Sequence, residues 1–198
     1  MKLIFLGAPG SGKGTQGARL SAQLRIPHIS TGEMLREAVA AGSTLGREVA
    51  SLIDCGKLVP DNLALALVRK ALDRLDAAAG FILDGFPRTV PQAQDLDRLL
   101  NSRSLSLDAV IELRIEEAAL FNRIRGRTRE SEARGDAARK DDNAEVLKIR
   151  LDAYHLRTSP LVDYYAERGL VKVVDGSKSV DAVYDEIRAR LAANLKQL

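Results

Sequence analysis

The residues best suited to chemistry form a glycine-rich run near the start of the chain, GAPGSGK at positions 7–13. Its G-x-x-x-x-G-K spacing is typical of a phosphate-binding loop: the glycines let the backbone turn so that successive N–H groups face phosphate oxygens, and the lysine adds a positive charge. A strict motif continues with Ser or Thr, but this chain has Gly14 and then Thr15, so the pattern does not indicate magnesium ligation by a hydroxyl at the usual place. The alternative interpretation is a glycine-rich turn that binds nothing.

A second candidate group is the segment DGFPRT at positions 84–89, which begins where an apolar run ends at Asp84. An acid at a strand end can hold Mg²⁺ directly or through water, and Arg88 can bind phosphate oxygens with two donors. Taken alone, the segment fits equally well an aspartate that caps a turn beside a surface arginine. The phosphate-binding loop upstream favours the functional interpretation.

Arginines are concentrated in one later part of the chain. A polyphosphate partner would explain this concentration, although mixed charge more often marks a solvated, salt-bridged helical surface. The residues concerned are Arg123, Arg125, Arg127, Arg129, Arg134, Arg139 and Arg150.

Strands are needed to bring the first two groups together. Short apolar runs predict strands at residues 2–6, 81–84, 109–113 and 170–174, with a further short one at 26–29. Ligands of parallel sheets bind beyond the carboxyl ends of the strands, so we expect Gly7 and Asp84 to meet at one edge.

Helical patterns alternate with these runs and predict an α/β fold, in which helices cover both faces of a parallel sheet. The first helix should begin near Lys13, with Ala18, Leu20 and Leu24 on its buried side. The others are expected at about 62–76, 90–101, 115–125, 143–168 and 179–195.

Two segments do not fit the alternation. Residues 30–59 have the pattern of short helices with no strand between them, and residues 127–139 are polar without an apolar period. We interpret the first segment as an inserted helical subdomain and the second as a surface lid. The expected breaks in the first are at Gly42, Ser43, Gly46 and Gly56.

The composition of the 198 residues excludes several classes of protein. A net charge of only +3 and an aromatic content of 4% without Trp argue against a nucleic-acid partner. No apolar run approaches the roughly 20 residues that span a bilayer, so we expect no membrane partner and a cytoplasmic location. The single Cys55 excludes an internal disulfide and a multi-cysteine zinc site.

Several separated motifs, in order, resemble the short-lid form of the adenylate kinase family over nearly the whole chain. They are GAPGSGKGT (7–15), STGEMLR (30–36), GKLVP (56–60), DGFPRT (84–89), PQA (91–93), RIRGR (123–127), RKDD (139–142) and Arg150.

The resemblance implies a P-loop NTPase three-layer fold, with a central parallel sheet flanked by helices. The implied core comprises residues 1–29, 60–126 and 140–198, with an AMP-binding insert at 30–59 and a short lid at 127–139. The implied activity is reversible transfer of the γ-phosphoryl of ATP to AMP, giving two ADP, by a monomer that uses Mg²⁺ with ATP. Since the lid contains neither Cys nor His, no structural zinc is expected, and no contacts are assigned within residues 128–138.

The resemblance also assigns roles to individual residues. Those implied to bind ATP are Gly10, Ser11, Gly12, Lys13, Gly14, Thr15, Arg123, Arg127 and Lys178, the last near the adenine through its backbone. Those implied to surround AMP are Thr31, Arg36, Lys57, Leu58, Val59, Gly85, Phe86, Pro87, Arg88, Gln92, Arg139 and Arg150. Those implied to act on the transferred phosphoryl are Lys13, Arg88, Arg127, Arg139, Arg150 and Asp84, with Asp84 holding Mg²⁺ through water rather than as a direct ligand.

Two alternatives stay open at this point. One is another nucleoside-monophosphate kinase, for UMP, CMP or GMP; relatives that use UMP or CMP typically have Ala where this chain has Thr31, and the Gln92 amide can both donate to and accept from an adenine edge. The other is a P-loop nucleotide switch, which would not need a second nucleotide pocket.

Simpler structural roles are expected for a few polar residues. Thr31 could also be the N-cap of a helix, and Asp142 with Glu145 resembles a capping box. His28 and His155 are interpreted as structural, because phosphoryl transfer of this kind needs no base.

Overall fold

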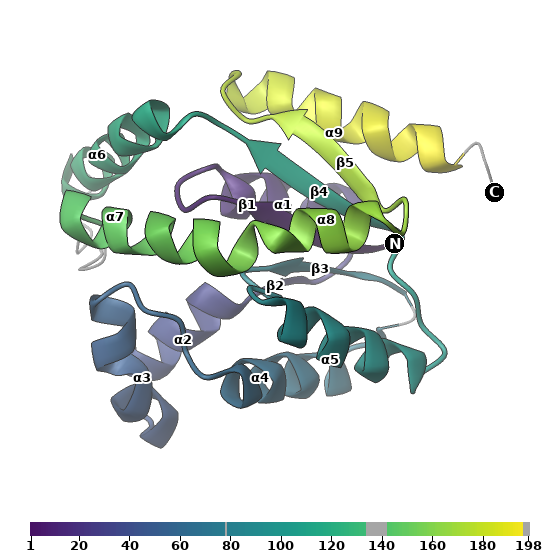
Figure 1. Cartoon of the computed structure of the whole chain (residues 1–198), viewed down its shortest axis with the longest axis horizontal. Helices are drawn as coiled ribbons and strands as arrows, with labels where there is room; N and C mark the ends of the chain where they lie inside the picture. Colours follow the sequence, from purple (N-terminus) through teal and green to yellow (C-terminus); the bar gives the residue numbers. More distant parts are fainter. Residues whose placement is uncertain (78, 134–141, 196–198) are drawn as a thin grey trace.

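The computed structural model describes residues 1–77, 79–133 and 142–195 and contains a parallel sheet of five strands in the order β2-β3-β1-β4-β5 (Figure 1). The strands are β1 (Lys2–Gly7), β2 (His28–Ser30), β3 (Phe81–Asp84), β4 (Ala109–Arg114) and β5 (Val171–Asp175). Each lies within two residues of its predicted bounds.

The neighbouring inner strands β1 and β3 are buried on both faces, which is why their sequences are continuous apolar runs rather than alternating ones. In β1 the side chains of Leu3, Ile4 and Phe5 are at most 1% exposed, and all of β3 is buried. Parallel pairing sets Phe5 opposite Asp84, so the ends of β1 and β3 lie at the same edge of the sheet. The predicted meeting of Gly7 and Asp84 at that edge is therefore confirmed.

Helices cover both faces of the sheet and complete a three-layer α/β fold, as predicted (Figure 1). One face packs against α4 (Asp61–Asp73), α5 (Val90–Asn101) and α8 (Pro160–Ala166), and the other against α1 (Lys13–Leu24) and α9 (Val180–Leu195). The remaining helices are α2 (Thr31–Ala40), α3 (Thr44–Asp54), α6 (Glu117–Ala133) and α7 (Ala144–Ala153). In the described part of the chain, no helix combines the length and apolarity needed to span a membrane.

Two helical predictions were wrong in extent. The helix expected at 115–125 continues as α6 to Ala133, within the segment interpreted as a lid. The single helix expected at 143–168 is divided into α7, a π-helix at Tyr154–Thr158 and α8. Pro160 lies in the first turn of α8, where its missing N–H costs no intrahelical hydrogen bond.

The buried face of α1 agrees with the prediction at Leu20 but not at Ala18. Ala18 is exposed, whereas Gln16, Gly17 and Leu20 are buried. A Cβ on Gly17 would lie 2.6 Å from Nε2 of His28, so the glycine makes room for the imidazole ring between α1 and the sheet. Leu20 is buried as predicted and Leu24 packs partly buried against the same core cluster, so the prediction was wrong only at Ala18.

Two predicted helix caps lie one residue away from their expected positions. Ser30, not Thr31, is the N-cap of α2 and accepts from the Glu33 N–H. Asn143, not Asp142, caps α7 through the Val146 N–H at 2.9 Å.

The inserted segment contains α2 and α3, which pack against each other. Gly46, expected to break a helix, lies inside α3, where its N–H donates to the N-cap hydroxyl of Ser43 at 3.0 Å. A Cβ on Gly46 would lie 2.0 Å from the carbonyl oxygen of Ala38, which shows that glycine is needed there for close approach of the two helices.

We expect Gly46→Ala to lower the free energy of unfolding by about 1–3 kcal/mol, because the added methyl overlaps backbone that cannot rotate away. Urea unfolding measures the change. The matched control is Gly126→Ala in α6, where an added Cβ meets no atom within 4 Å and alanine favours the helix. Equal stability of the two variants would contradict the packing interpretation.

Candidate active site

A cavity of about 770 Å³ lies at the carboxyl edge of the sheet. Its volume falls within the roughly 300–1,000 Å³ typical of ligand sites. Its walls come from the phosphate-binding loop, the end of β3, α6, α7 and the segment after β5. These parts are distant in sequence and are brought together by the strand order.

The phosphate-binding loop joins β1 to α1. Gly10 and Gly12 have φ values of +83° and +99°, in the region that glycine adopts without strain. Gly12 is the N-cap of α1, and no side chain caps the helix there. The first N–H groups of α1 are thus not satisfied by a capping side chain, and an anion would be favoured at this positive helix end.

Lys13 curls over this loop. Its Nζ donates to the carbonyl oxygens of Gly7 at 2.7 Å and Ala8 at 2.9 Å. The ammonium group therefore lies at the mouth of the loop, inside the main cavity.

Asp84 places a carboxylate in the main cavity close to the start of α1, where an added Cβ on Gly14 would lie 3.6 Å from its Oδ2. Burial alone would raise the pKa of Asp84, but the neighbouring His28 imidazole and the charges of Lys13 and Arg88 outweigh it and lower the pKa below its ordinary value. The separation of 3.7 Å between His28 Nε2 and Asp84 Oδ2 is too long for a hydrogen bond, so we treat this contact as electrostatic. The carboxylate is consequently held ionised at neutral pH.

A second cavity, of about 60 Å³, adjoins the first under α2 and α3. Arg36, Arg88 and Arg150 line both cavities, so three arginines border the region where the two cavities adjoin. The second cavity is smaller than most ligand sites, and a nucleotide that enters it must widen it.

Arg88 is fixed by its own backbone as well as by its side chain. Its N–H donates to Oε1 of Gln92 at 2.7 Å, and its carbonyl accepts from the Thr158 hydroxyl at 2.9 Å. Its Nε donates to the carbonyl of Gly85 at 2.9 Å. These contacts hold the segment after β3 against α5 and the π-helix.

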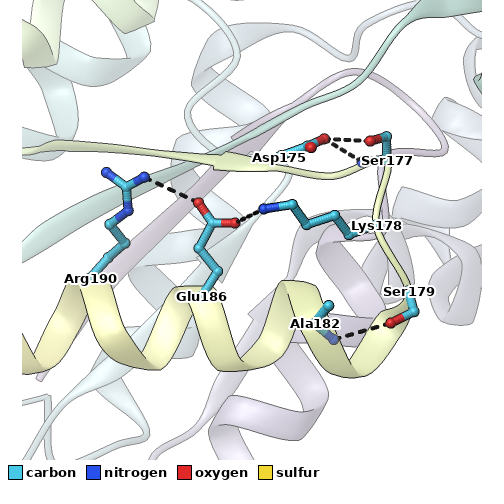
Figure 2. Close-up of polar contacts among 7 residues, drawn as sticks. All are labelled: Asp175, Ser177, Lys178, Ser179, Ala182, Glu186 and Arg190. Atoms are coloured by element: carbon cyan, nitrogen blue, oxygen red, sulfur yellow. Dashed lines mark hydrogen bonds and ion pairs between the residues drawn. The ribbon is translucent and has the colours of Figure 1, made fainter.

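The segment after β5 forms the other end of the main cavity (Figure 2). The Asp175 carboxylate accepts from both the N–H and the hydroxyl of Ser177, at 2.9 and 2.6 Å, which closes a tight turn. Figure 2 shows the Lys178 side chain extended toward α9, where its Nζ donates to Glu186 at 2.7 Å. Lys178 thus borders the cavity while its ammonium is directed to α9, and Arg190 binds the second oxygen of Glu186 at 3.1 Å.

Arg123 connects the two ends of the main cavity. One guanidinium nitrogen donates to the carbonyl of Ser11 in the phosphate-binding loop at 3.3 Å, and another to the carbonyl of Gly176 at 2.6 Å. From α1, the Gln16 amide also donates to the carbonyl of Val180 at 2.9 Å. The segment after β5 is therefore fastened to the phosphate-binding loop at two points.

Most residues assigned by the family resemblance border these cavities. The main cavity is lined by Gly10, Ser11, Gly12, Lys13, Gly14, Thr15, Asp84, Pro87, Arg123 and Lys178. Both cavities are lined by Arg36, Leu58, Gly85, Arg88 and Arg150. The second alone is lined by Thr31, Lys57, Val59 and Gln92.

Three assigned residues are not placed at these cavities. Phe86 is 1% exposed, packs in the hydrophobic core and lines neither cavity. Arg139 lies outside the described residues, as does the side chain of Arg127, although α6 extends through position 127.

Sequence reasoning missed several residues that hold the site in shape: Gln16, Asp61, Thr158 and Glu186. None belongs to a pattern that points to chemistry, and each acts through a partner distant in sequence. The position of Thr158 could not be inferred from helical spacing because it lies in the π-helix, whose register differs from that of α7.

Comparison with known proteins connects this geometry to a family. The adenylate kinase family model matches residues 5–170. A protein named adenylate kinase from Methylobacterium nodulans is 53% identical over 183 residues, which cover 92% of this chain and 92% of that protein. Its counterpart from Nitrobacter winogradskyi is 52% identical, with 95% and 91% covered, and that from Sinorhizobium medicae is 48% identical, with 97% and 100% covered.

The lowered pKa of Asp84 predicts a pH dependence of stability. Because the unfolded chain takes up this proton more readily, the stabilisation is present above the unfolded pKa, near 4, and is lost as the pH falls through the folded pKa. We expect the difference in free energy of unfolding between wild type and Asp84→Asn to shrink below about pH 4. Urea unfolding from pH 7 to pH 3 measures it, and a difference that grows with acid would contradict the assignment.

Proposed function

The chain belongs to the adenylate kinase family, as its motifs predicted, and on that premise we propose that its two adjoining cavities bind ATP and AMP end to end for reversible transfer of the γ-phosphoryl of ATP to AMP. ATP would lie in the main cavity, with its phosphates on the loop at 7–15 and its base toward the segment after β5. AMP would lie in the second cavity. The comparisons lend no support to the two alternatives that the sequence left open.

The observation that carries this proposal is that Arg36, Arg88 and Arg150 line both cavities. A site for one nucleotide needs cations only around its own phosphates. Three guanidinium groups at a shared boundary suit two phosphate chains that meet there, because each can bind phosphate oxygens with two donors.

The chemistry asked of these residues is alignment and charge stabilisation. Holding the two reactants in line supplies about 7–11 kcal/mol of the barrier, and fixed positive charges favour the charge that spreads over the transferred oxygens. We assign these charges to Lys13, Arg88 and Arg150, together with Arg127 and Arg139 on the basis of the family alone. No general base is required.

Mg²⁺ fits the site through Asp84. The carboxylate is held ionised inside the main cavity, and an added Cβ on Gly14 would lie 3.6 Å from its Oδ2, so the loop passes close by. Among the described residues no group of three or more His, Cys, Asp or Glu side chains could hold a metal by itself. We therefore assign Asp84 to hold the ion through water, and the ion, when bound with ATP, neutralises phosphate charge.

We propose that residues 30–59 and the lid predicted at 127–139, of which residues 134–139 lie outside the described part of the chain, close over AMP and ATP. This closure would exclude water and prevent wasteful hydrolysis. We further propose a cytoplasmic monomer whose partners are ATP, AMP and ADP rather than nucleic acid or membrane.

The direct test is ADP formation from ATP with AMP, UMP, CMP and GMP in turn. We expect AMP to be used best. In the same assay Lys13→Met should lower kcat by at least about 10²- to 10³-fold, because it removes a positive charge from the transferring phosphoryl. The matched control is Lys70→Met, exposed on α4 outside both cavities. Near-normal turnover by a folded Lys13→Met variant would reject the site assignment.

A further prediction concerns the segment after β5. Glu186→Gln removes the acceptor charge that holds Lys178, so the segment should become less ordered and the KM for ATP should rise about two- to five-fold with the KM for AMP unchanged. The adjacent exposed Asp185→Asn makes the same change of charge and is the control. Equal shifts in both KM values would show that Glu186 acts on the whole fold instead.

A further inference from the structure

The side chain of Gln92 is fixed at both ends although it lines the second cavity. It is 2% exposed; its Nε2 donates to Oδ1 of Asp61 at 2.7 Å, and its Oε1 accepts from the Arg88 N–H at 2.7 Å. Asp61 is the first residue of α4, and its second oxygen accepts from the Thr89 hydroxyl at 3.2 Å. That hydroxyl in turn accepts from the Gln92 N–H as the N-cap of α5.

These partners allow only one orientation of the Gln92 amide. A carboxylate can only accept, and a backbone N–H can only donate. With the amide reversed, its oxygen would face the Asp61 carboxylate and its NH₂ group would face the Arg88 N–H, so both hydrogen bonds would be lost inside a buried site. The amide is thus oriented by charge and chemistry and not only by packing.

The fixed orientation leaves Gln92 with one defined donor and one defined acceptor. One N–H of Nε2 and one lone pair of Oε1 are not used by Asp61 and Arg88. A purine with a 6-amino group offers an acceptor at N1 and a donor at N6, and this pair is complementary to the amide. A 6-oxo purine offers the reverse, a donor at N1 and an acceptor at O6. An amide free to rotate could serve either edge, whereas a fixed one serves only one.

We propose that Asp61 is a specificity-determining residue that acts through Gln92, so that the second cavity accepts 6-amino purine monophosphates and rejects 6-oxo ones. This inference rests on the proposed function, in which the second cavity takes the acceptor nucleotide. The competing explanation is that Asp61 only favours the start of α4, where an acid interacts well with the helix dipole. That explanation predicts an effect on stability and none on the choice of base.

The test compares kcat/KM for AMP, GMP and IMP in wild type, Asp61→Asn and Asp61→Glu. In Asp61→Asn the side chain can present either an oxygen or an NH₂ group to Gln92, so only the Arg88 N–H still favours one orientation of the amide. We expect the ratio of kcat/KM for AMP to that for GMP to fall about ten-fold, with the KM for ATP unchanged. Asp61→Glu keeps an acceptor-only group and should retain a ratio closer to that of wild type.

The control variant is Asp163→Asn, an exposed acid in the first turn of α8 that loses the same charge away from both cavities. It should leave the ratio unchanged. If Asp61→Asn lowers kcat/KM for AMP and GMP equally, or leaves their ratio at the wild-type value, the proposal is wrong and Asp61 is structural.

Wild-type enzyme gives an independent measurement should Asp61→Asn fail to fold. IMP has the 6-oxo group and N1–H of GMP without the 2-amino group, so the fixed amide should reject IMP as strongly as GMP. Use of IMP nearly equal to that of AMP would overturn the proposal. A wild-type enzyme that made no ADP from ATP and AMP would instead overturn the proposed function, so the two failures can be told apart.

Discussion

The parallel pairing of β1 with β3 is the constraint on which the site depends. It sets Phe5 opposite Asp84, so the phosphate-binding loop and the acidic strand end leave the sheet at one edge. Both strands must be apolar throughout to be buried between two helical layers, and polar residues can begin only where the strands stop. The candidate site residues therefore begin at Gly7 and Asp84, because the apolar core ends at these two positions.

Nearby positive charges stabilise the buried carboxylate at this edge of the sheet. The Asp84 carboxylate is buried, which alone would disfavour its ionised form, but Lys13, Arg88 and the His28 ring compensate. Gly17 contributes indirectly to the stabilisation of this carboxylate, because its missing side chain leaves space for the His28 ring. At the other end of the main cavity, Arg123 spans the carbonyls of Ser11 and Gly176 and so fixes the phosphate end and the far end of the cavity in one geometry. Such preorganisation reduces the entropy that a ligand must lose on binding.

The strands and the phosphate-binding loop could be read from sequence because each depends on neighbouring residues. Apolar runs located every strand, and the glycine spacing located the loop. Contacts between distant segments could not be read in this way. Ser30 rather than Thr31 caps α2, and Gly46 lies inside α3, where a side chain would overlap Ala38, instead of breaking the helix. The role of Asp61 depends on Gln92, thirty-one residues later, and no local pattern joins the two. Family resemblance supplied the site residues that border the cavities, but not the residues that hold them in place.

The number of residues in the π-helix at Tyr154–Thr158 fixes how α7 is oriented relative to α8. On its N-terminal side α7 carries Arg150 to the boundary between the cavities, and on its C-terminal side α8 buries Tyr165 completely in the core. Deleting one residue there would turn the two helices relative to each other by about 100°. Arg150 and Tyr165 could not then both keep their places. Insertions and deletions in this stretch should accordingly be tolerated poorly, even when they preserve every side chain at the cavities.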